Sequence, residues 1–481
     1  MRRAAAVIAL CAAAGLAAPT PVVAQAQATP PAPMALRPYR MPAVQRATLP
    51  NGVLVVVVEQ HALPIVTARL ISDAGAMYEP ADKSGLALLT AEMLREGTAT
   101  MTGPQLAARM EGLGATFVTA GSFSLAQEQI TALPDAFPAA FELATQVFTA
   151  PAFPATEFPR VQQTAIANYE QAMAQVEGIA PGIFQKAIFD AASPFARSPS
   201  GTAATLGAIT RDDLVAWHRD NFTPAATIAL FVGDITLADA TALATRTLGS
   251  WRAGAGVSRR ADTTPHRWPN GPRVILVDRP GSEQSAIRVG GQGIGGGDPD
   301  YIPLNALQHV LGGGFNSRVN RNLRERNGWT YGAFTEYTTL RGAGWLSVFA
   351  SVRTDATDAA LVEALGEYRK IAAEPIPDAE LRAALDNLVS GFPSTVQTVQ
   401  GLAERVQRLL LYGLPFDYYS TYREKLAAVT PAQAQQVARR HMAPNAPTMV
   451  VVGDLSRIEA PIRARNLGTV EVWDRDGKKL R

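Results

Sequence analysis

The sequence has very few of the side chains that most often bind metals or cross-link a chain. Of its 481 residues, one is cysteine and five are histidine. The single cysteine, Cys11, allows neither an internal disulfide framework nor a cluster of thiolate ligands. Because no histidine has another within 40 residues, no helix can carry the histidine pair of a zinc helix. The five histidines are His61, His218, His266, His309 and His441.

An excess of charge of either sign is also lacking. The chain has 44 lysine and arginine residues against 42 aspartate and glutamate residues, for a formal net charge of +2. A chain this close to neutral lacks the basic surface on which nucleic acid or anionic lipid binds, so we expect no nucleic-acid partner. Its 47% hydrophobic and 18% charged residues are typical of globular proteins. The length is enough for two to four domains.

The one long apolar run lies at the N-terminus. Arg2 and Arg3 precede 15 apolar residues at 4–18, and small residues follow at 22–26. This order is typical of a secretory signal, and the run is shorter than the ~18–20 residues that span a bilayer. We therefore expect a cleaved signal peptide at 1–26, then a Pro/Ala-rich tether at 27–43. The protein would be periplasmic, without a membrane span.

Two blocks of sequence repeat at a nearly constant spacing. Residues 210–234 and 430–454 share one order of features, at an offset of 220 residues. Each has a threonine suited to cap a helix, an amphipathic helix, a proline turn and a strand that ends in Val-Gly-Asp. A second pair of blocks, 153–158 and 376–381, repeats at an offset of 223 residues. The repeats predict two homologous domains of about 210 residues each.

The rest of the pattern sets the domain bounds and the fold class. We assign the domains to residues 44–252 and 273–481, joined by a linker at 253–272 that is rich in turn-forming residues. In the first domain, β-branched runs at 53–58 and 65–71 predict strands. Helical patterns follow at 85–94, 135–148 and 157–174. We therefore predict an α+β fold, in which each domain has a mixed or antiparallel sheet with helices packed on one face.

The helix predicted at 85–94 leads to the function. It ends in Met-Leu-Arg-Glu-Gly-Thr at 93–98. In this segment the chain resembles the pitrilysin/insulinase family of inverted zincins, whose corresponding helix carries H-x-x-E-H followed by Met-Leu-x-x-Gly-Thr. In that family the two histidines bind zinc and the glutamate activates water. The five motif positions fall here on Leu88, Leu89, Thr90, Ala91 and Glu92.

These residues cannot form the zinc site that the resemblance implies. Leu88 cannot bind a metal, Ala91 replaces the general base, and Glu92 alone cannot supply the three protein ligands that zinc requires. The family's remaining glutamate ligand falls near Asn168, while Glu170 is displaced and we expect it to be a solvated helix residue. We therefore expect no metal in this chain.

The second half keeps a different family motif. Residues 312–331 closely resemble G-G-G-x-x-S-R-L followed by L-R and, seven residues after the arginine, tyrosine; here the pair is Arg324 and Tyr331. In the family this pair donates hydrogen bonds to peptide carbonyls and to the developing oxyanion. The local pattern predicts a helix at 318–326 and a strand at 329–340. Alternatively, Arg324 pairs with an acidic residue of its helix and Tyr331 only packs.

In two-chain bacterial members of the family, one subunit carries the zinc motif and the other carries the Arg/Tyr pair. The resemblance thus implies a non-catalytic subunit of a heteromeric zinc endopeptidase, inactive alone. Zinc would lie in a homologous partner, and Arg324 and Tyr331 would bind the peptide substrate in trans. One alternative is an inert structural or peptide-binding scaffold of the same fold. Another is a hydrolase with chemistry other than zinc, which the lack of a G-x-S-x-G motif argues against.

Overall fold

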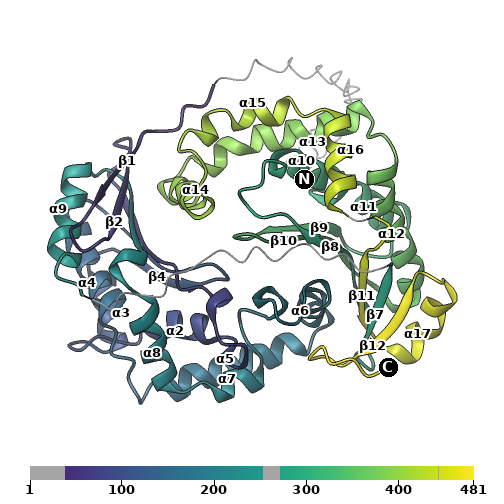
Figure 1. Cartoon of the computed structure of the whole chain (residues 1–481), viewed down its shortest axis with the longest axis horizontal. Coiled ribbons are helices and arrows are strands. Elements are labelled where there is room, and N and C mark those ends of the chain that lie inside the picture. Colours follow the sequence, from purple (N-terminus) through teal and green to yellow (C-terminus); the bar gives the residue numbers. More distant parts are fainter. Residues whose placement is uncertain (1–37, 253–270, 443) are drawn as a thin grey trace, which may run out of the picture. The chain divides into compact units, whose positions relative to one another are not determined.

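The computed structural model describes residues 38–252, 271–442 and 444–481. The expected signal peptide at 1–26, most of the tether at 27–43 and nearly all of the linker at 253–272 lie outside the described residues. Figure 1 shows the chain with its helices and strands labelled.

The first half of the described chain is built on a six-stranded mixed sheet. Its strand order is β1-β2-β6-β3-β5-β4, in which β2 and β6 run parallel and the other neighbours are antiparallel. The strands are β1 (Val44–Thr48), β2 (Leu54–Glu59), β3 (Val66–Ser72), β4 (Thr116–Gly121), β5 (Ala126–Ala132) and β6 (Thr227–Gly233). The helices are α2 (Leu86–Leu94), α3 (Gly103–Gly112), α4 (Phe137–Thr149), α5 (Phe158–Met173), α6 (Val176–Ile188), α7 (Ala203–Ala208), α8 (Arg211–Asn221) and α9 (Leu237–Leu248).

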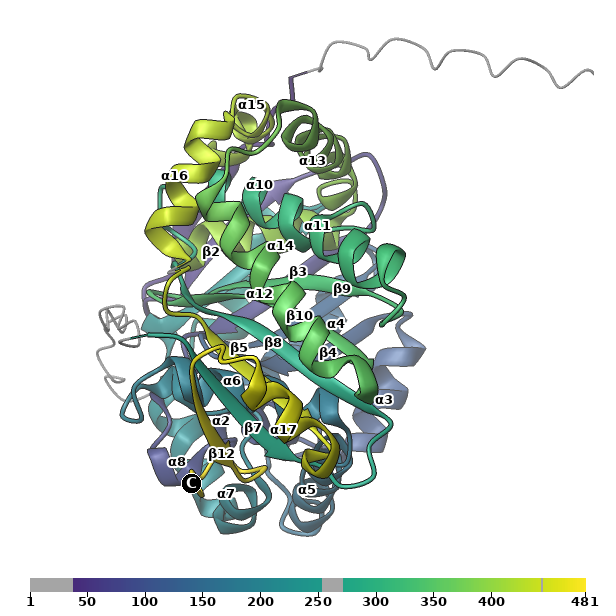
Figure 2. The same ribbon diagram turned by 90° about the vertical axis from the view of Figure 1, so that its right-hand side faces the viewer.

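The second half repeats this design. Its sheet has the order β12-β7-β11-β8-β10-β9, and β7 runs parallel to both β11 and β12. The strands are β7 (Arg273–Asp278), β8 (Gln284–Gly293), β9 (Ala333–Thr339), β10 (Gly344–Arg353), β11 (Thr448–Gly453) and β12 (Thr469–Trp473). The helices are α10 (Tyr301–Gly312), α11 (Arg318–Asn320), α12 (Thr357–Ala373), α13 (Asp378–Gly391), α14 (Val399–Tyr412), α15 (Tyr422–Ala427), α16 (Pro431–His441) and α17 (Leu455–Ala464). In Figure 2, α12 and α17 lie across this sheet.

The predicted fold class is confirmed, and the repeat blocks fold alike. In both halves the repeat forms a helix followed by a central strand, α8 with β6 and α16 with β11. The hydroxyl of Thr210 accepts a hydrogen bond from the Asp213 amide, and that of Thr430 accepts one from the Gln433 amide. These capping boxes satisfy amide groups that have no partner within the helix.

The central strands of each sheet are buried on both faces, whereas the sequence predicted helices on one face only. In β2, Val55 and Val57 face the core shared with the helices of the first half, whereas Val56 and Val58 face α14. In the second sheet, α6 covers β8 and β11 in the same way. Each half therefore lends one helix to the other half's sheet. The continuous valine run in β2 fits a strand that is buried on both faces.

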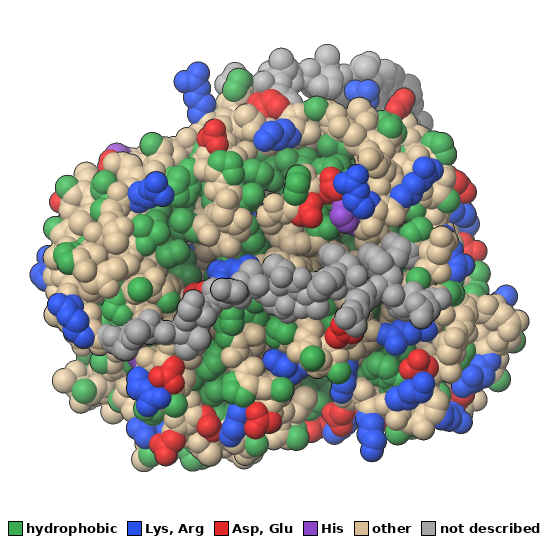
Figure 3. Space-filling model, viewed as in Figure 1, with side chains coloured by type: hydrophobic (Ala, Val, Ile, Leu, Met, Phe, Trp, Pro, Cys, Tyr) green, Lys and Arg blue, Asp and Glu red, His purple; other side chains and the backbone are tan. Residues whose placement is uncertain are grey.

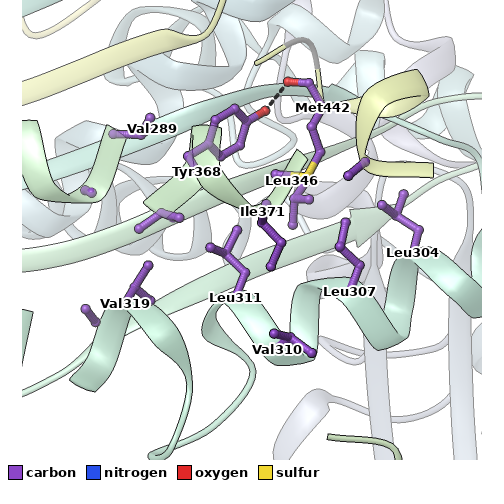
Figure 4. Packing of buried hydrophobic residues seen from close by; sticks show 14 of the residues in the cluster. Val289, Leu304, Leu307, Val310, Leu311, Val319, Leu346, Tyr368, Ile371 and Met442 are labelled. Atoms are coloured by element: carbon purple, nitrogen blue, oxygen red, sulfur yellow. Dashed lines mark hydrogen bonds between the residues drawn. The ribbon is translucent and has the colours of Figure 1, made fainter. Parts of the chain in front are cut away.

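The core of the second half fixes the orientation of α10. Leu304, Leu307 and Leu311 point from this helix toward Leu346 of β10, among other buried side chains (Figure 4). Nearby, the hydroxyl of Tyr368 donates a hydrogen bond to the main-chain carbonyl of Met442. Because successive turns of one face of α10 are committed to this core, residues on its other side remain for a different use.

One predicted boundary was wrong. The strand expected from Trp329 begins only at Ala333. The Trp329 amide donates to the Leu323 carbonyl at 3.0 Å, and its carbonyl accepts from the Arg353 amide at 3.1 Å. These bonds hold residues 329–332 in a turn, which Gly328 enters with a φ of +64°. The helix expected at 318–326 forms as α11 followed by a π-helical turn at Arg321–Arg326.

On the face shown in Figure 3, basic and acidic side chains are interspersed and no broad area has one sign. Of the helices that the structure describes, none combines the length and the apolar character needed to cross a bilayer.

Candidate functional site

The helix that corresponds to the zinc helix, α2, is held at its start by a buried carboxyl group. Glu79 accepts hydrogen bonds from the amides of Gly85, at 3.1 Å, and Ala87. Its side chain is buried, and this burial raises the pKa of Glu79 to about 7, although the two amide bonds act in the opposite direction. Gly85 has a φ of +99°, and a Cβ there would lie 2.8 Å from Leu206. The position therefore requires glycine.

The residues at the zinc-motif positions lie at and beside one pocket. Leu88 and Glu92 of α2 line a pocket of about 670 Å³, and Asn168 of α5 lines it as well. Ala91 is fully buried behind this lining. Glu170 lies in an exposed ion pair with Arg475, at 3.2 Å. The structure thus brings together the two positions at which the family has histidines and the position of its remaining glutamate ligand.

The side chains at the zinc-motif positions of this pocket do not fit zinc. Of these positions, only the Glu92 carboxyl and the Asn168 amide offer an oxygen or nitrogen atom, and zinc requires three protein ligands. Burial also raises the pKa of Glu92, which disfavours the charged form that a metal needs. None of the histidines in the described chain lines the pocket. We therefore assign no metal-dependent step to it.

Sequence reasoning missed that the C-terminal segment borders this pocket. The hydroxyl of Tyr169 donates a hydrogen bond to Asp476 at 2.8 Å, and the Lys186 ammonium donates to the Asp476 carbonyl at 3.0 Å. Arg475 and Asp476 are both part of the pocket lining. These contacts join residues about 300 positions apart, and no local sequence pattern predicts them.

The described histidines have other roles. His218 is partly buried, its Nε2 donates a hydrogen bond to the Phe148 carbonyl at 2.8 Å, and burial lowers its pKa to about 4. His61 is exposed and lies 2.6 Å from Asp234. His441 lies 2.7 Å from Asp300, and together with Asp298 these groups could face a metal. However, Arg440 also binds the same oxygen of Asp300, at 2.6 Å, so this cluster is an ion-pair network.

The predicted Arg/Tyr pair lies elsewhere, at the turn that precedes β9. The guanidinium of Arg324 stacks on the Phe315 ring, 4.9 Å from its centroid, and within the described chain no carboxylate lies within the 4 Å of an ion pair. Tyr331 is 92% exposed. Neither side chain lines the pocket beside α2. The roles assigned to them remain predictions.

The neighbours of Arg324 behave differently. Arg318 and Arg321 both pair with Glu380 of α13, at 2.7 and 3.1 Å. Glu380 thus neutralises two other arginines of the segment that carries Arg324. Tyr331 likewise has almost no packing, because most of its surface is in contact with solvent.

Known proteins resemble this chain over most of its length. An uncharacterized zinc protease of Mycobacterium tuberculosis strain H37Rv is 25% identical over 405 residues, which cover 82% of this chain and 90% of the relative. A second uncharacterized zinc protease, from Streptomyces coelicolor, is 22% identical over 87% of this chain and 91% of its own length.

Two solved structures share the fold. One is the peptidase M16 inactive domain from Pseudomonas fluorescens, with a TM-score of 0.79, 24% identity, and coverage of 85% of this chain and 98% of that chain. The other is a protease from Helicobacter pylori, with a TM-score of 0.78, 18% identity, and coverage of 86% and 100%.

Two family descriptions match successive parts of the sequence. Residues 54–192 match "Insulinase (Peptidase family M16)", and residues 208–388 match "Peptidase M16 inactive domain". The first segment contains the altered zinc helix, and the second contains both Arg324 and Tyr331. Because the matched segments together cover more than half of the chain, it belongs to the pitrilysin/insulinase peptidase family, M16.

Proposed function

We propose that this chain is the non-catalytic subunit of a heteromeric zinc endopeptidase. It would bind a homologous subunit that carries an intact zinc motif, and Arg324 and Tyr331 would contact the peptide substrate at the partner's zinc site. The chain itself would supply no metal ligand. Consistent with the expected signal peptide, we place the complex in the periplasm.

The observation that carries this proposal is the free state of the Arg/Tyr pair. In a purely structural role, Arg324 would pair with an acid and Tyr331 would pack. Instead, Arg324 has only an aromatic neighbour and Tyr331 is 92% exposed. A guanidinium that no carboxylate of the described chain neutralises and an exposed phenol are suited to donate hydrogen bonds to a peptide carbonyl and to the negative charge that grows on it during hydrolysis.

The state of the α2 pocket supports the division of labour. The helix and the pocket at the zinc-motif positions are present, yet only Glu92 and Asn168 could act as metal ligands at those positions. A chain with this pocket needs another subunit for metal-dependent hydrolysis. Metal-dependent hydrolysis is also the chemistry after which two relatives of this chain are named as zinc proteases.

The test is reconstitution with a zinc-bearing homologue. We expect Tyr331→Phe, which keeps the ring and removes the hydroxyl, to lower turnover by ~10²–10³-fold, as the loss of an oxyanion donor does. Arg324→Ala should also weaken substrate binding, because it removes an anchor that acts in the ground state as well. Arg326→Ala, an exposed arginine two residues away, is the matched control and should leave kcat/KM unchanged.

Assembly is measured in parallel by size-exclusion chromatography. If Tyr331→Phe assembles normally and turns over at the wild-type rate, the catalytic role of the pair is wrong, and the structural or peptide-binding scaffold becomes the better explanation. The periplasmic location is tested separately by N-terminal sequencing of the protein from cells. Retention of Met1 or Arg2 would contradict it.

A further inference from the structure

A second pocket lies between α10 and the edge strand β9. Its volume is about 370 Å³, and it is lined by polar side chains of both elements together with Arg408 of α14. From α10, the lining residues Tyr301, Asn305 and Gln308 recur at helical spacing, so they share one side of the helix. The pocket is thus built into the architecture of the second half.

Arg408 is the only charged side chain in this lining, and it lacks an acidic partner. Its guanidinium stacks on Tyr301 and Tyr412, 4.2 and 5.1 Å from the ring centroids. Within the described chain, no carboxylate lies within ion-pair distance of it, and its Nη2 is buried without a hydrogen bond. Asp298 is close enough to affect Tyr337, yet its Oδ1 accepts from the Asp300 amide instead, at 2.8 Å.

A second donor in the same pocket is also unused. The hydroxyl of Tyr337 is buried without a partner. Burial raises the pKa of Tyr337 far above its usual value, so this hydroxyl keeps its proton. The other polar groups bind one another: the Thr335 hydroxyl donates to the Gln308 amide oxygen at 2.8 Å, and the Gln308 amide nitrogen donates to Asn305 at 3.1 Å.

We propose that this pocket binds a carboxylate group of a peptide, held by the guanidinium of Arg408 and the hydroxyl of Tyr337. Two buried donors without acceptors are costly, and one anionic acceptor satisfies both. A single guanidinium matches the single negative charge of a carboxylate better than the roughly double charge of a phosphate. The carboxylate is either the C-terminus of the peptide or an aspartate or glutamate side chain.

The position of the pocket connects it with the proposed peptide site, and to that extent the inference rests on the proposed function. Phe334 lines the pocket and lies 6.2 Å from Phe315, the ring on which Arg324 stacks. Tyr337 follows Tyr331 by six residues, so their Cα atoms are at most ~20 Å apart. β9 is also the edge of its sheet. The pocket would therefore set a preference for an acidic group a few residues from the bond that is cut.

The experiment measures peptide binding to the isolated full chain by fluorescence anisotropy, without partner, zinc or turnover. Three labelled peptides share one neutral sequence. The first has an amidated C-terminus, the second adds a central glutamate to it, and the third has a free C-terminal carboxylate. We expect at least one acidic peptide to bind ~10- to 100-fold more tightly than the neutral one, and the arm that does so identifies the source of the carboxylate.

Arg408→Gln should abolish this preference. The matched control is Arg405→Gln, on the same face of α14, because Arg405 also stacks on a tyrosine, Tyr419, at 5.9 Å, but lies outside the pocket lining. Tyr337→Phe should reduce the preference several-fold, and it decides the matter if circular dichroism shows that Arg408→Gln is unfolded.

Equal binding of all three peptides would overturn the inference. So would a preference for acidic peptides that survives Arg408→Gln, or one that is unchanged in Tyr337→Phe. Because the readout needs neither partner nor catalysis, it is independent of the reconstitution test. A normal rate in the Tyr331→Phe complex would refute the proposed function and leave the carboxylate preference intact. If the wild-type chain showed no preference for acidic peptides, the carboxylate site would be refuted and the proposed function would be unaffected.

Discussion

The two halves place a helix and an edge strand in the same arrangement but put different side chains on it. In the first half, α2 packs on the edge strand β4, and its pocket-facing side carries Leu88 and Glu92. In the second half, α10 packs on the edge strand β9, and its pocket-facing side carries Tyr301, Asn305 and Gln308. The fold has thus been kept in both halves while the chemistry of the two pockets has diverged.

The comparison shows which features the fold itself requires. Both halves retain capped helices before their central strands, and both bury the central strands of the sheet on two faces. The pocket lining is under no such constraint, because a leucine or an alanine fits a helix as well as a histidine or a glutamate does. A zinc site can therefore be lost without loss of the fold.

The largest expected effect tests whether both halves are equally well packed. Leu89 of α2 and Leu307 of α10 are almost fully buried. We expect Leu89→Ala and Leu307→Ala each to lower the free energy of unfolding by ~2–5 kcal/mol, measured by urea denaturation. Leu63→Ala, at an exposed position, is the control and should change it by less than ~0.5 kcal/mol. A cost below ~1 kcal/mol at Leu89 alone would mean that the first half has loosened together with its chemistry.

The next effect concerns the carboxyl group that holds the start of α2. Glu79 has a pKa of about 7 in the folded protein, against an ordinary value of 4.5. Between pH 4.5 and pH 7 the Glu79 carboxyl holds its proton in the folded state but not in the unfolded state. The stability that protonated Glu79 contributes is therefore present at pH 5 and is lost as the pH rises toward 8. The full difference amounts to ~3 kcal/mol.

Glu79→Gln should flatten this dependence, which is measured by urea denaturation at pH 5 and pH 8. His218 contributes with the opposite sign, since its pKa is lowered to about 4 and its contribution is lost as the pH falls below ~6.5. The variant is therefore compared with wild type at each pH. An equal loss of stability at both pH values would show that Glu79 does not titrate in this range.

A smaller effect tests the equivalence of the repeated capping boxes. Thr210→Ala and Thr430→Ala each remove one side-chain acceptor at the start of a helix. Each should lower the free energy of unfolding by ~0.5–2 kcal/mol, and the two costs should be similar. Thermal unfolding of both variants provides the measurement. A cost confined to one half would show that its repeat has come to depend on other contacts.

The smallest effect is expected at Glu170, the acidic residue nearest in sequence to Asn168, the position of the missing ligand. Its ion pair with Arg475 is exposed. We expect Glu170→Gln to change stability by no more than ~1 kcal/mol, and to change it less in high salt. The better buried pair of Arg318 with Glu380 serves as comparison, and Glu380→Gln should cost more. A larger loss at Glu170 would assign it a structural role that its exposure does not suggest.

Much of the fold could be predicted from the sequence, because it is written in local patterns. The threonine caps, the Val-Gly-Asp strand ends and the helix at α2 follow from spacing along the chain. The exchange of α6 and α14 between the sheets could not be predicted, since a helix with one apolar face looks the same whichever sheet it covers. The strand before Ala333 was misjudged because main-chain bonds to Leu323 and Arg353 hold that segment in a turn.

The candidate site divides in the same way. The positions of the altered zinc motif could be read from the sequence because a helical motif has fixed spacing, and the structure places Leu88, Glu92 and Asn168 at one pocket. The pocket that contains Arg408 could not be predicted from the sequence, because its lining joins residues of α10, β9 and α14 that are far apart in the sequence. An arginine can be recognised as unpaired only when its neighbours in space are known.

The central claim is that this chain acts at a zinc ion that it does not hold. The most direct test is the zinc content of the purified chain alone and of its complex with a zinc-bearing homologue, measured by atomic spectroscopy beside chelator-sensitive peptidase activity. We predict no stoichiometric zinc and no activity for the chain alone, and about one zinc per pair of chains in the active complex. About one zinc bound to the chain alone, with peptidase activity that a chelator abolishes, would contradict the account.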